Sequence, residues 1–286
     1  MEAYASVFYL KNSASLLIVK IQPNYDILIK HMFKNNKQIL YQIILSITFS
    51  IALTGGFLVA QVPITDQPQW LAIAFVSLLT LPTWIGLLGQ VGIKRGILLI
   101  FVLSITASAI EGFALTTGFP YGHFTYYYTA GYKLFNLVPL TVPLSWSTLI
   151  IGSYAIVSHF GIKKFLPTIL SMIACMIGID LLMDPVMVSL RVWTWDVPGW
   201  YYGVPLVNYL GWIGSGMTGA MIMYGGMKHT SRLDRYTGLM TLGLYLFIIF
   251  WLIIAFMRGL WIPGLIGIVF LIITRRSFIR LFKIVE

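Results

Sequence analysis

Hydrophobic residues recur in runs of close to 20 residues, which polar segments separate from about residue 39 onward. A helix needs about 20 apolar residues to cross the hydrocarbon core of a bilayer. The pattern therefore predicts an all-α fold, a polytopic transmembrane helical bundle of about eight spans. The predicted spans cover residues 39–60, 70–89, 97–116, 144–160, 166–183, 207–227, 238–257 and 260–274.

The last two runs are nearly continuous, and together they are too long for one crossing. Arg258 and Gly259, followed by Pro263 and Gly264, form the sequence in this stretch that favours a turn. We therefore expect two separate helices on either side of it.

Basic residues are abundant in every second connecting segment and rare in the others, and this distribution tests the predicted number of spans. Lys and Arg accumulate in the cytoplasmic loops of membrane proteins. If the N-terminus is cytoplasmic, sixteen of the 19 basic residues fall in inner segments, and the outer loops hold Lys133, Arg191 and Arg258. Both termini are therefore predicted to be cytoplasmic. The expected organisation is a basic N-terminal segment over 1–38, a transmembrane domain over 39–274 and a basic tail over 275–286.

Composition excludes several classes of protein. Only 10% of the residues are charged, whereas soluble domains carry about a quarter. The net charge of +10 could indicate nucleic acid, but the basic residues flank lipid-soluble spans and act as topology signals. No nucleic-acid partner is expected, and no cleaved signal peptide, because the first apolar run, 39–60, is too long for a signal core. The single cysteine, Cys175, cannot form an internal disulfide or a multi-thiolate metal site.

Two predicted outer loops, 117–143 and 184–206, are long, aromatic and rich in glycine and proline. We expect such loops to fold back onto the membrane. Tyrosine and tryptophan favour the headgroup level of a bilayer, so an aromatic belt is one interpretation. A substrate-lining role is the other, and the sequence favours neither. The second loop carries Trp193, Trp195, Trp200, Tyr201 and Tyr202.

Three acidic residues, Glu111, Asp180 and Asp184, fall within or at the ends of predicted spans. An ionised carboxylate there costs roughly 2.5–3.5 kcal/mol even on lenient scales, and such residues are functional by default. The two spans that carry them run in the same direction, so the three can lie at similar depth. Asp180 and Asp184 are four residues apart on one helical face, and Pro185 is predicted to end or kink that helix. Structural hydrogen bonds between helices are the alternative role.

Other motifs favour structural roles or exclude known chemistry. Asn208 follows Pro205 at the start of a span, where a helix cap is expected. A stripe of small residues in the same span suits close helix packing; it comprises Gly211, Ser215 and Gly219. The four histidines are scattered, and no nucleotide fingerprint or serine elbow is present. Any chemistry is therefore expected to use carboxylates, aromatic residues and water, with no metal and no cofactor.

The residues of these spans and loops resemble two signatures of the carotenoid hydratase family, of the γ-carotene 1′-hydratase and bisanhydrobacterioruberin hydratase type. The resemblance covers about residues 97–225, with Tyr121 where the family often has phenylalanine. The first signature consists of Glu111, Gly118, Pro120, Tyr121, Gly122 and Tyr126. The second consists of Asp180, Asp184-Pro185-Val186-Met187, Trp193-Thr194-Trp195, Tyr202-Gly203-Val204-Pro205, Asn208 and Gly211-Trp212.

The resemblance implies addition of water to the terminal double bond of a linear carotenoid by a multi-pass protein of a prokaryotic cell membrane. Asp184 or Asp180 would donate the proton, and Glu111 would orient or deprotonate water, although the sequence does not fix which acid does which. The implied substrate-binding residues are Tyr121, Tyr126, Trp193, Trp195, Tyr202 and Asn208. The implied partners are a lipophilic carotenoid, water and the lipid bilayer, with other enzymes of the pathway as candidates.

Three other functions remain open at the level of sequence. A carotenoid cyclase could trap the same cation with a neighbouring double bond, and its product would keep the mass of the substrate. A transporter or channel could use the acids as a proton relay, although they gather toward one side. A carotenoid-binding or assembly subunit would bind the pigment without converting it.

Overall fold

The computed structural model describes residues 39, 42–61, 67–127, 130–228, 230 and 236–280. The chain divides into two units, Met1–Ile47 with Val285–Glu286, and Thr48–Ile284. The second unit carries the features below. The predicted basic segment over 1–38 and the end of the predicted tail, 281–286, lie outside the described residues, as do His31 and His229.

Helices occupy all eight predicted positions, which confirms the all-α bundle. The first helix is Gln42–Gln61. It is followed by α2 (Gln69–Val91), α3 (Ile93–Thr117), α4 (Thr141–His159), α5 (Phe165–Ser189), α6 (Leu206–Met227), α7 (Thr237–Met257), α8 (Trp261–Ile273) and α9 (Arg275–Arg280). The turn predicted at Arg258 and Gly259 separates α7 from α8, whereas Pro263 and Gly264 lie within α8. The predicted basic tail begins as the short helix α9.

Six of the helices in the described part of the chain are long and apolar enough to cross a membrane. The glycine-rich α6 is not among them, and α8 has 13 residues. At 1.5 Å per residue, α8 extends about 20 Å, less than the roughly 30 Å hydrocarbon core. By the length and composition of its helices, the chain is a multi-pass membrane protein.

Glycines let several of the helices approach one another closely. A Cβ atom at Gly243 of α7 would lie 2.5 Å from the Leu79 carbonyl oxygen of α2. The Gly243 amide also donates a hydrogen bond to the Thr83 hydroxyl over 3.1 Å. In the stripe of small residues on α6, a Cβ at Gly219 would lie 2.4 Å from the Ile150 side chain of α4, as expected for close helix packing. A Cβ atom added at Gly211, in the same stripe, would meet the first aromatic loop instead of a helix.

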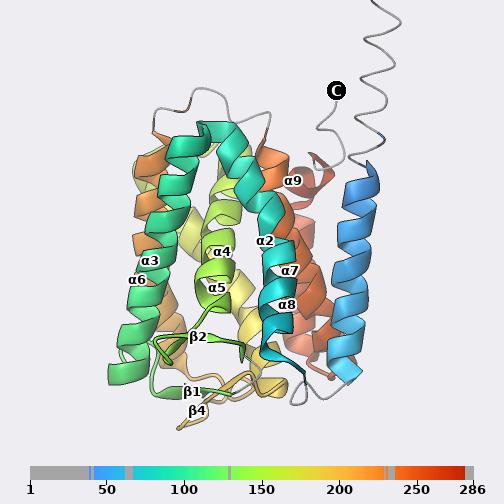
Figure 1. Ribbon diagram of the computed structural model, residues 1–286, viewed down its shortest axis with the longest axis vertical. Coiled ribbons are helices and arrows are strands. Elements are labelled where there is room, and N and C mark those ends of the chain that lie inside the picture. Colours follow the sequence, from blue (N-terminus) through green and yellow to red (C-terminus); the bar gives the residue numbers. More distant parts are fainter. Residues whose placement is uncertain are drawn as a thin grey trace, which may run out of the picture. The chain divides into compact units, whose positions relative to one another are not determined.

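The two aromatic loops pair with each other across one end of the bundle. Strand β1 (Phe124–Tyr126) lies antiparallel to β4 (Trp193–Trp195). A shorter pair, β2 (Lys133–Leu134) and β3 (Val138–Pro139), lies in the first loop. Figure 1 shows β1, β2 and β4 together at one end and α9 at the other. The loops therefore form an ordered cap over the ends of α3 and α5.

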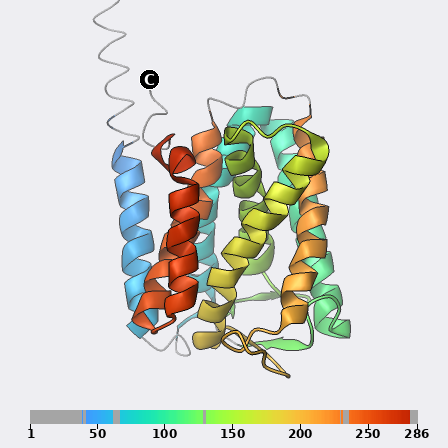
Figure 2. The ribbon, with the colours of Figure 1, turned by 180° about the vertical axis from the view of Figure 1, so that it is seen from behind.

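Helix α5 runs through Pro185 to Ser189, so of the two outcomes predicted for this proline, an end or a kink, the end is wrong. Proline lacks the N–H that would donate to the carbonyl four residues earlier, which here belongs to Leu181. The Tyr201 hydroxyl donates to that carbonyl instead, over 2.9 Å. A loop residue thus satisfies the group that Pro185 leaves open. Figure 2 shows α5 beside α6, both reaching the end that carries the strands.

Candidate functional site

The three predicted acids converge from two helices. Glu111 on α3 is 8% exposed, and Asp180 and Asp184 on α5 are 1% and 2% exposed. Glu111 and Asp184 line the same cavity, which has a volume of about 100 Å³ and is called the acidic chamber below. Asp180 is not part of its lining and lies one helical turn before Asp184. The structure therefore brings all three together but exposes two of them to the chamber.

Asn208, in the first turn of α6, connects the two aspartates. Its side-chain amide donates one hydrogen bond to Asp180 Oδ2 over 3.1 Å and another to Asp184 Oδ2. The N-cap of α6 is Pro205, with no side-chain cap hydrogen bond, so the prediction that Asn208 caps the helix is wrong. Buried carboxyl groups need hydrogen-bond donors, and the amide serves that purpose. Because both bonds start from the same nitrogen, the Oδ2 atoms of Asp180 and Asp184 lie close together.

Tyr126 holds the carboxyl group of Glu111 from the cap. Its hydroxyl donates to Glu111 Oε1 over 2.8 Å. Burial and the neighbouring Glu111 carboxylate raise the pKa of Tyr126 well above its usual value, and the same two causes raise the pKa of Tyr121. Both tyrosines therefore stay neutral near physiological pH, and Tyr126 keeps the proton that it donates to Glu111.

Aromatic rings form the walls of the acidic chamber. In the β1–β4 register, Tyr126 faces Trp193 and Phe124 faces Trp195. The ring centroids of these pairs lie 5.5 Å and 6.0 Å apart. Trp195 is fixed by a 2.8 Å hydrogen bond from its indole N–H to the Tyr121 carbonyl oxygen. The strand pairing thus places aromatic faces from both loops around the acids.

Gly211 explains how the first loop reaches this position. A Cβ atom there would lie 2.5 Å from the Tyr121 ring and 2.8 Å from the Pro120 carbonyl oxygen. Only a residue without a side chain lets the loop pack so closely against α6. The ring of Tyr121 then lies 6.3 Å from that of Trp212, and both line the chamber.

The aromatic residues of the loops divide into two groups. Five of the six predicted substrate-binding residues line the chamber, namely Tyr121, Tyr126, Trp193, Trp195 and Asn208. Tyr202 does not; its ring packs on Tyr201 with the centroids 5.1 Å apart. Phe135 and Trp200 are 97% and 86% exposed. The loops therefore carry both chamber-lining and exposed aromatic residues, and the aromatic belt and the substrate-lining role both stay predictions.

The sequence did not single out the wall that α4 contributes. Thr141, Ser145, Trp146 and Leu149 line the chamber from this helix. Thr141, Ser145 and Leu149 are four residues apart and therefore lie on one helical face. Two hydroxyl residues on one face of an apolar helix could have indicated from the sequence that this face lines a site. Val142 of the same helix also lines the chamber. Beyond α4, the lining residues that were not predicted to bind substrate are Phe124, Met183, Val192 and Trp212, of which Trp212 belongs to the second signature.

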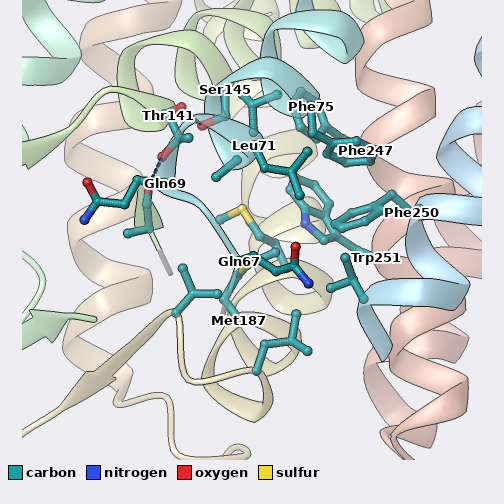
Figure 3. Close-up of a pocket in the computed structure, with 18 of the residues that line it drawn as sticks. Gln67, Gln69, Leu71, Phe75, Thr141, Ser145, Met187, Phe247, Phe250 and Trp251 are labelled. Carbon is teal, nitrogen blue, oxygen red and sulfur yellow. Dashed lines mark hydrogen bonds between the residues drawn. The ribbon is translucent and has the colours of Figure 1, made fainter. Parts of the chain in front are cut away.

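A second and larger space, called the apolar cavity below, has a volume of about 440 Å³. Its walls come from the first helix, α2, α4, α5, α7 and the start of the second loop. Figure 3 shows four aromatic side chains gathered along one wall, Phe75, Phe247, Phe250 and Trp251. Five residues line both this cavity and the acidic chamber: Thr141, Ser145, Met183, Val192 and Trp193.

Among the described residues, no group of three or more His, Cys, Asp and Glu residues lies close enough together to hold a metal ion. The acids of the chamber are instead paired with an amide and a phenol.

Comparison with known proteins adds two findings. A family model described as "Carotenoid biosynthesis protein" matches residues 67–274, a longer stretch than the 97–225 over which the signatures were found. The bisanhydrobacterioruberin hydratase of Haloarcula japonica is 30% identical over 188 residues, which are 64% of this chain and 64% of that protein. The matching region thus spans less than two thirds of that relative. No solved structure matches.

Proposed function

We propose that this chain, which belongs to the carotenoid biosynthesis protein family, adds water to the terminal double bond of a linear carotenoid. A relative that shares 30% of its residues over the matching region is named a hydratase. The observation that carries the proposal is the acidic chamber, where carboxyl groups from two helices face one space enclosed by aromatic rings. Hydration of an alkene needs a proton donor, a proton acceptor, a water molecule and protection of a cation, and the chamber offers groups for each.

Asp184 is the proposed proton donor. Asp180 and Asp184 are buried and accept hydrogen bonds from the same Asn208 nitrogen, so their Oδ2 atoms lie close together. Two carboxyl groups that close resist ionising together. The pair therefore shares a proton. Asp184 is the member that lines the chamber, so it is the one that can reach a ligand. Asp180 and Asn208 act as positioning residues behind it.

Glu111 is the proposed proton acceptor. Tyr126 donates to Glu111 Oε1, which fixes the orientation of the carboxyl group. The second oxygen of the carboxylate is left to bind water. General acid and base groups must lie within reach of the reacting atoms, and Glu111 and Asp184 face the chamber from different helices.

In the proposed reaction, Asp184 gives its proton to the alkene carbon that already carries one hydrogen. The double bond becomes a carbon–hydrogen bond and a tertiary cation, which the faces of Trp193, Trp195 and Tyr126 stabilise. Water attacks the cation, and Glu111 takes one of its protons. Proton exchange with solvent restores both acids, so the net change is alkene plus water to tertiary alcohol, with no change of oxidation state.

The size of the chamber is consistent with this reaction. Its volume of about 100 Å³ exceeds the roughly 10–15 Å³ that one water molecule requires. A small branched end group and one water can therefore be enclosed together. Against the aromatic walls, a bulky polar substrate would lose hydration without gaining enough hydrogen bonds.

The proposal extends to location. The strand-bearing end carries the loops that the distribution of basic residues assigns to the outer face. We therefore propose that the site lies near the outer surface of a prokaryotic cell membrane, with both termini in the cytoplasm, and that enzymes which make the carotenoid are candidate partners. Carotenoid would arrive from lipid and water from outside.

Product analysis tests the function. The full chain is expressed in a host that accumulates lycopene, the cells are grown in water labelled with heavy oxygen, and the pigments are measured by mass spectrometry. The expected product is heavier than lycopene by one labelled water. An isomer of unchanged mass would indicate a cyclase, and oxygen drawn from air would exclude hydration. Lycopene bound without conversion would indicate a carotenoid-binding protein.

A further inference from the structure

The apolar cavity adjoins the acidic chamber at a junction made of shared residues. Met183 precedes Asp184 on α5 and lines both spaces, and Trp193 does the same from β4. Thr141 and Ser145 line the junction from α4. A ligand whose end lies against Asp184 and that extends past these residues enters the apolar cavity.

The hydroxyl groups at the junction are already used by the protein. Thr141 Oγ1 donates to the Ala130 carbonyl oxygen over 3.1 Å, a bond drawn in Figure 3. Ser145 Oγ donates to the Thr141 carbonyl oxygen over 2.8 Å. Because both protons are engaged with the backbone, the junction presents methyl, methylene and ring surfaces to a ligand.

The remaining walls are suited to a flat, apolar chain. Phe75 and Phe250 have centroids 4.9 Å apart, and Phe247 stacks on Trp251 at 5.2 Å. No Asp, Glu, Lys or Arg lies among the lining residues. A volume of about 440 Å³ is in the range of pockets that hold small molecules, roughly 300–1,000 Å³. The polar side chains of the lining are those of Gln67, Gln69, Thr141 and Ser145, which are all uncharged, so an ion would lose hydration here without meeting an opposite charge.

The apolar cavity also opens on the lateral surface of the bundle, between two helices. Leu58 of the first helix and Leu71 of α2 line it and are 52% and 39% exposed. In a multi-pass membrane protein, apolar side chains exposed along helices face lipid. A hydrophobic chain can therefore enter between these two helices and lie across the bundle toward Asp184.

We infer that the apolar cavity binds the conjugated chain of the linear polyene whose end group is held in the acidic chamber. This inference rests on the proposed function for the identity of the end-group reaction, and it adds a separate site that supplies affinity and selects long chains. The junction at Met183 and Trp193 then positions the terminal double bond over Asp184.

Ala72 offers a way to test the cavity without touching the acids. It lines the cavity from α2, whereas Ala74, two residues along the same helix, is exposed and does not line it. Ala72→Trp fills the cavity, and Ala74→Trp adds the same bulk on the outer face as a matched control. Ala72→Leu provides a smaller graded change should the tryptophan variant fail to fold.

The experiment compares lycopene with sulcatone, a short ketone that ends in the same dimethylvinyl group. The ratio of kcat/KM for lycopene to that for sulcatone is measured with the full chain in lipid. We expect Ala72→Trp to lower this ratio about tenfold, the effect of losing burial of roughly two methylene groups. Ala72→Leu should lower it less, and Ala74→Trp should leave it unchanged. Equal ratios in the Ala72 and Ala74 variants would overturn the inference.

Direct binding separates failure of the inference from failure of the proposed function. Lycopene is titrated into the full chain carrying Glu111→Gln, and binding is followed by the shift of the polyene absorption band. Ala72→Trp in this background should weaken binding about tenfold relative to Ala74→Trp. If the wild-type chain hydrates neither compound yet this difference is found, the cavity assignment stands and the hydratase proposal fails. If lycopene is hydrated but the two variants bind it equally, the cavity assignment fails alone.

Discussion

The acidic chamber and the apolar cavity share five lining residues, yet they differ in size and chemistry. The chamber, of about 100 Å³, contains two carboxyl groups and an amide. The cavity, of about 440 Å³, has no charged lining residue and is bounded by four aromatic rings along one wall. Acid–base chemistry needs a few precisely held polar groups, whereas affinity for a hydrocarbon grows with the apolar area buried. This difference is the reason for proposing that reaction and binding take place in separate, adjoining spaces.

The largest effect is expected from the acids of the chamber. Glu111→Gln and Asp184→Asn each keep the size of the side chain but remove its acid–base function, so turnover should fall about 10²- to 10⁴-fold. Lycopene binding should persist, because the apolar cavity is untouched. Asp196→Asn is the control, since Asp196 is exposed and does not line the chamber. Turnover near the wild-type rate in both acid variants would break the assignment of chemistry to the chamber.

Asn208→Ala should have the next largest effect. It leaves the carboxyl groups of Asp180 and Asp184 without their shared donor, and an unsatisfied buried polar group costs about 1–3 kcal/mol. We expect a lower midpoint of thermal unfolding in detergent together with a lower kcat. A variant that unfolds at the wild-type temperature would show that the amide does not stabilise the pair.

Tyr126→Phe should lower kcat about tenfold, because it removes the one hydroxyl seen to hold Glu111 while keeping the ring in the chamber wall. KM for lycopene should change little. The matched control is Tyr127→Phe, which removes an exposed hydroxyl that lies 3.1 Å from the Thr194 hydroxyl. A loss carried by KM instead of kcat would assign Tyr126 to substrate binding.

Tyr202→Phe should have the smallest effect, within about twofold of wild type in kcat/KM, as for surface substitutions away from special features. The resemblance to known hydratases implies a substrate-binding role for this residue, but Tyr202 does not line either space. A tenfold loss for lycopene would mean that the chamber extends to Tyr202 when substrate is bound.

The positions of the helices could be predicted because the thickness of the bilayer sets the length of a spanning helix, and that length appears in the sequence as an apolar run. The direction of the spans indicated only that Glu111 and the two aspartates can lie at similar depth; their meeting in one chamber depends on how α3, α5 and α6 pack. Sidedness and the cytoplasmic termini, predicted from the basic residues, stay predictions.

Other parts of the site depend on contacts between distant segments, which periodicity does not report. The β1–β4 pairing joins Phe124 to Trp195, and the strands are only three residues long. Asn208 resembled a helix cap because the local sequence favours one, whereas the partners that decide its role lie on α5. Pro185 resembled a helix end because Tyr201, which satisfies the open carbonyl, is distant in sequence. The apolar cavity could not be predicted from the sequence, because its lining residues are of the same apolar types as the residues of the packed core.

The direct test of the central claim follows the proton that a buried carboxyl group gives to the hydrocarbon. Purified full chain in lipid is incubated with lycopene in heavy water, and the product is analysed by mass spectrometry and NMR. The account predicts one deuterium bonded to the carbon next to the tertiary alcohol, formed by wild type and lost with Asp184→Asn. A hydroxylated product without carbon-bound deuterium, or wild-type incorporation by the Asp184→Asn variant, would contradict it.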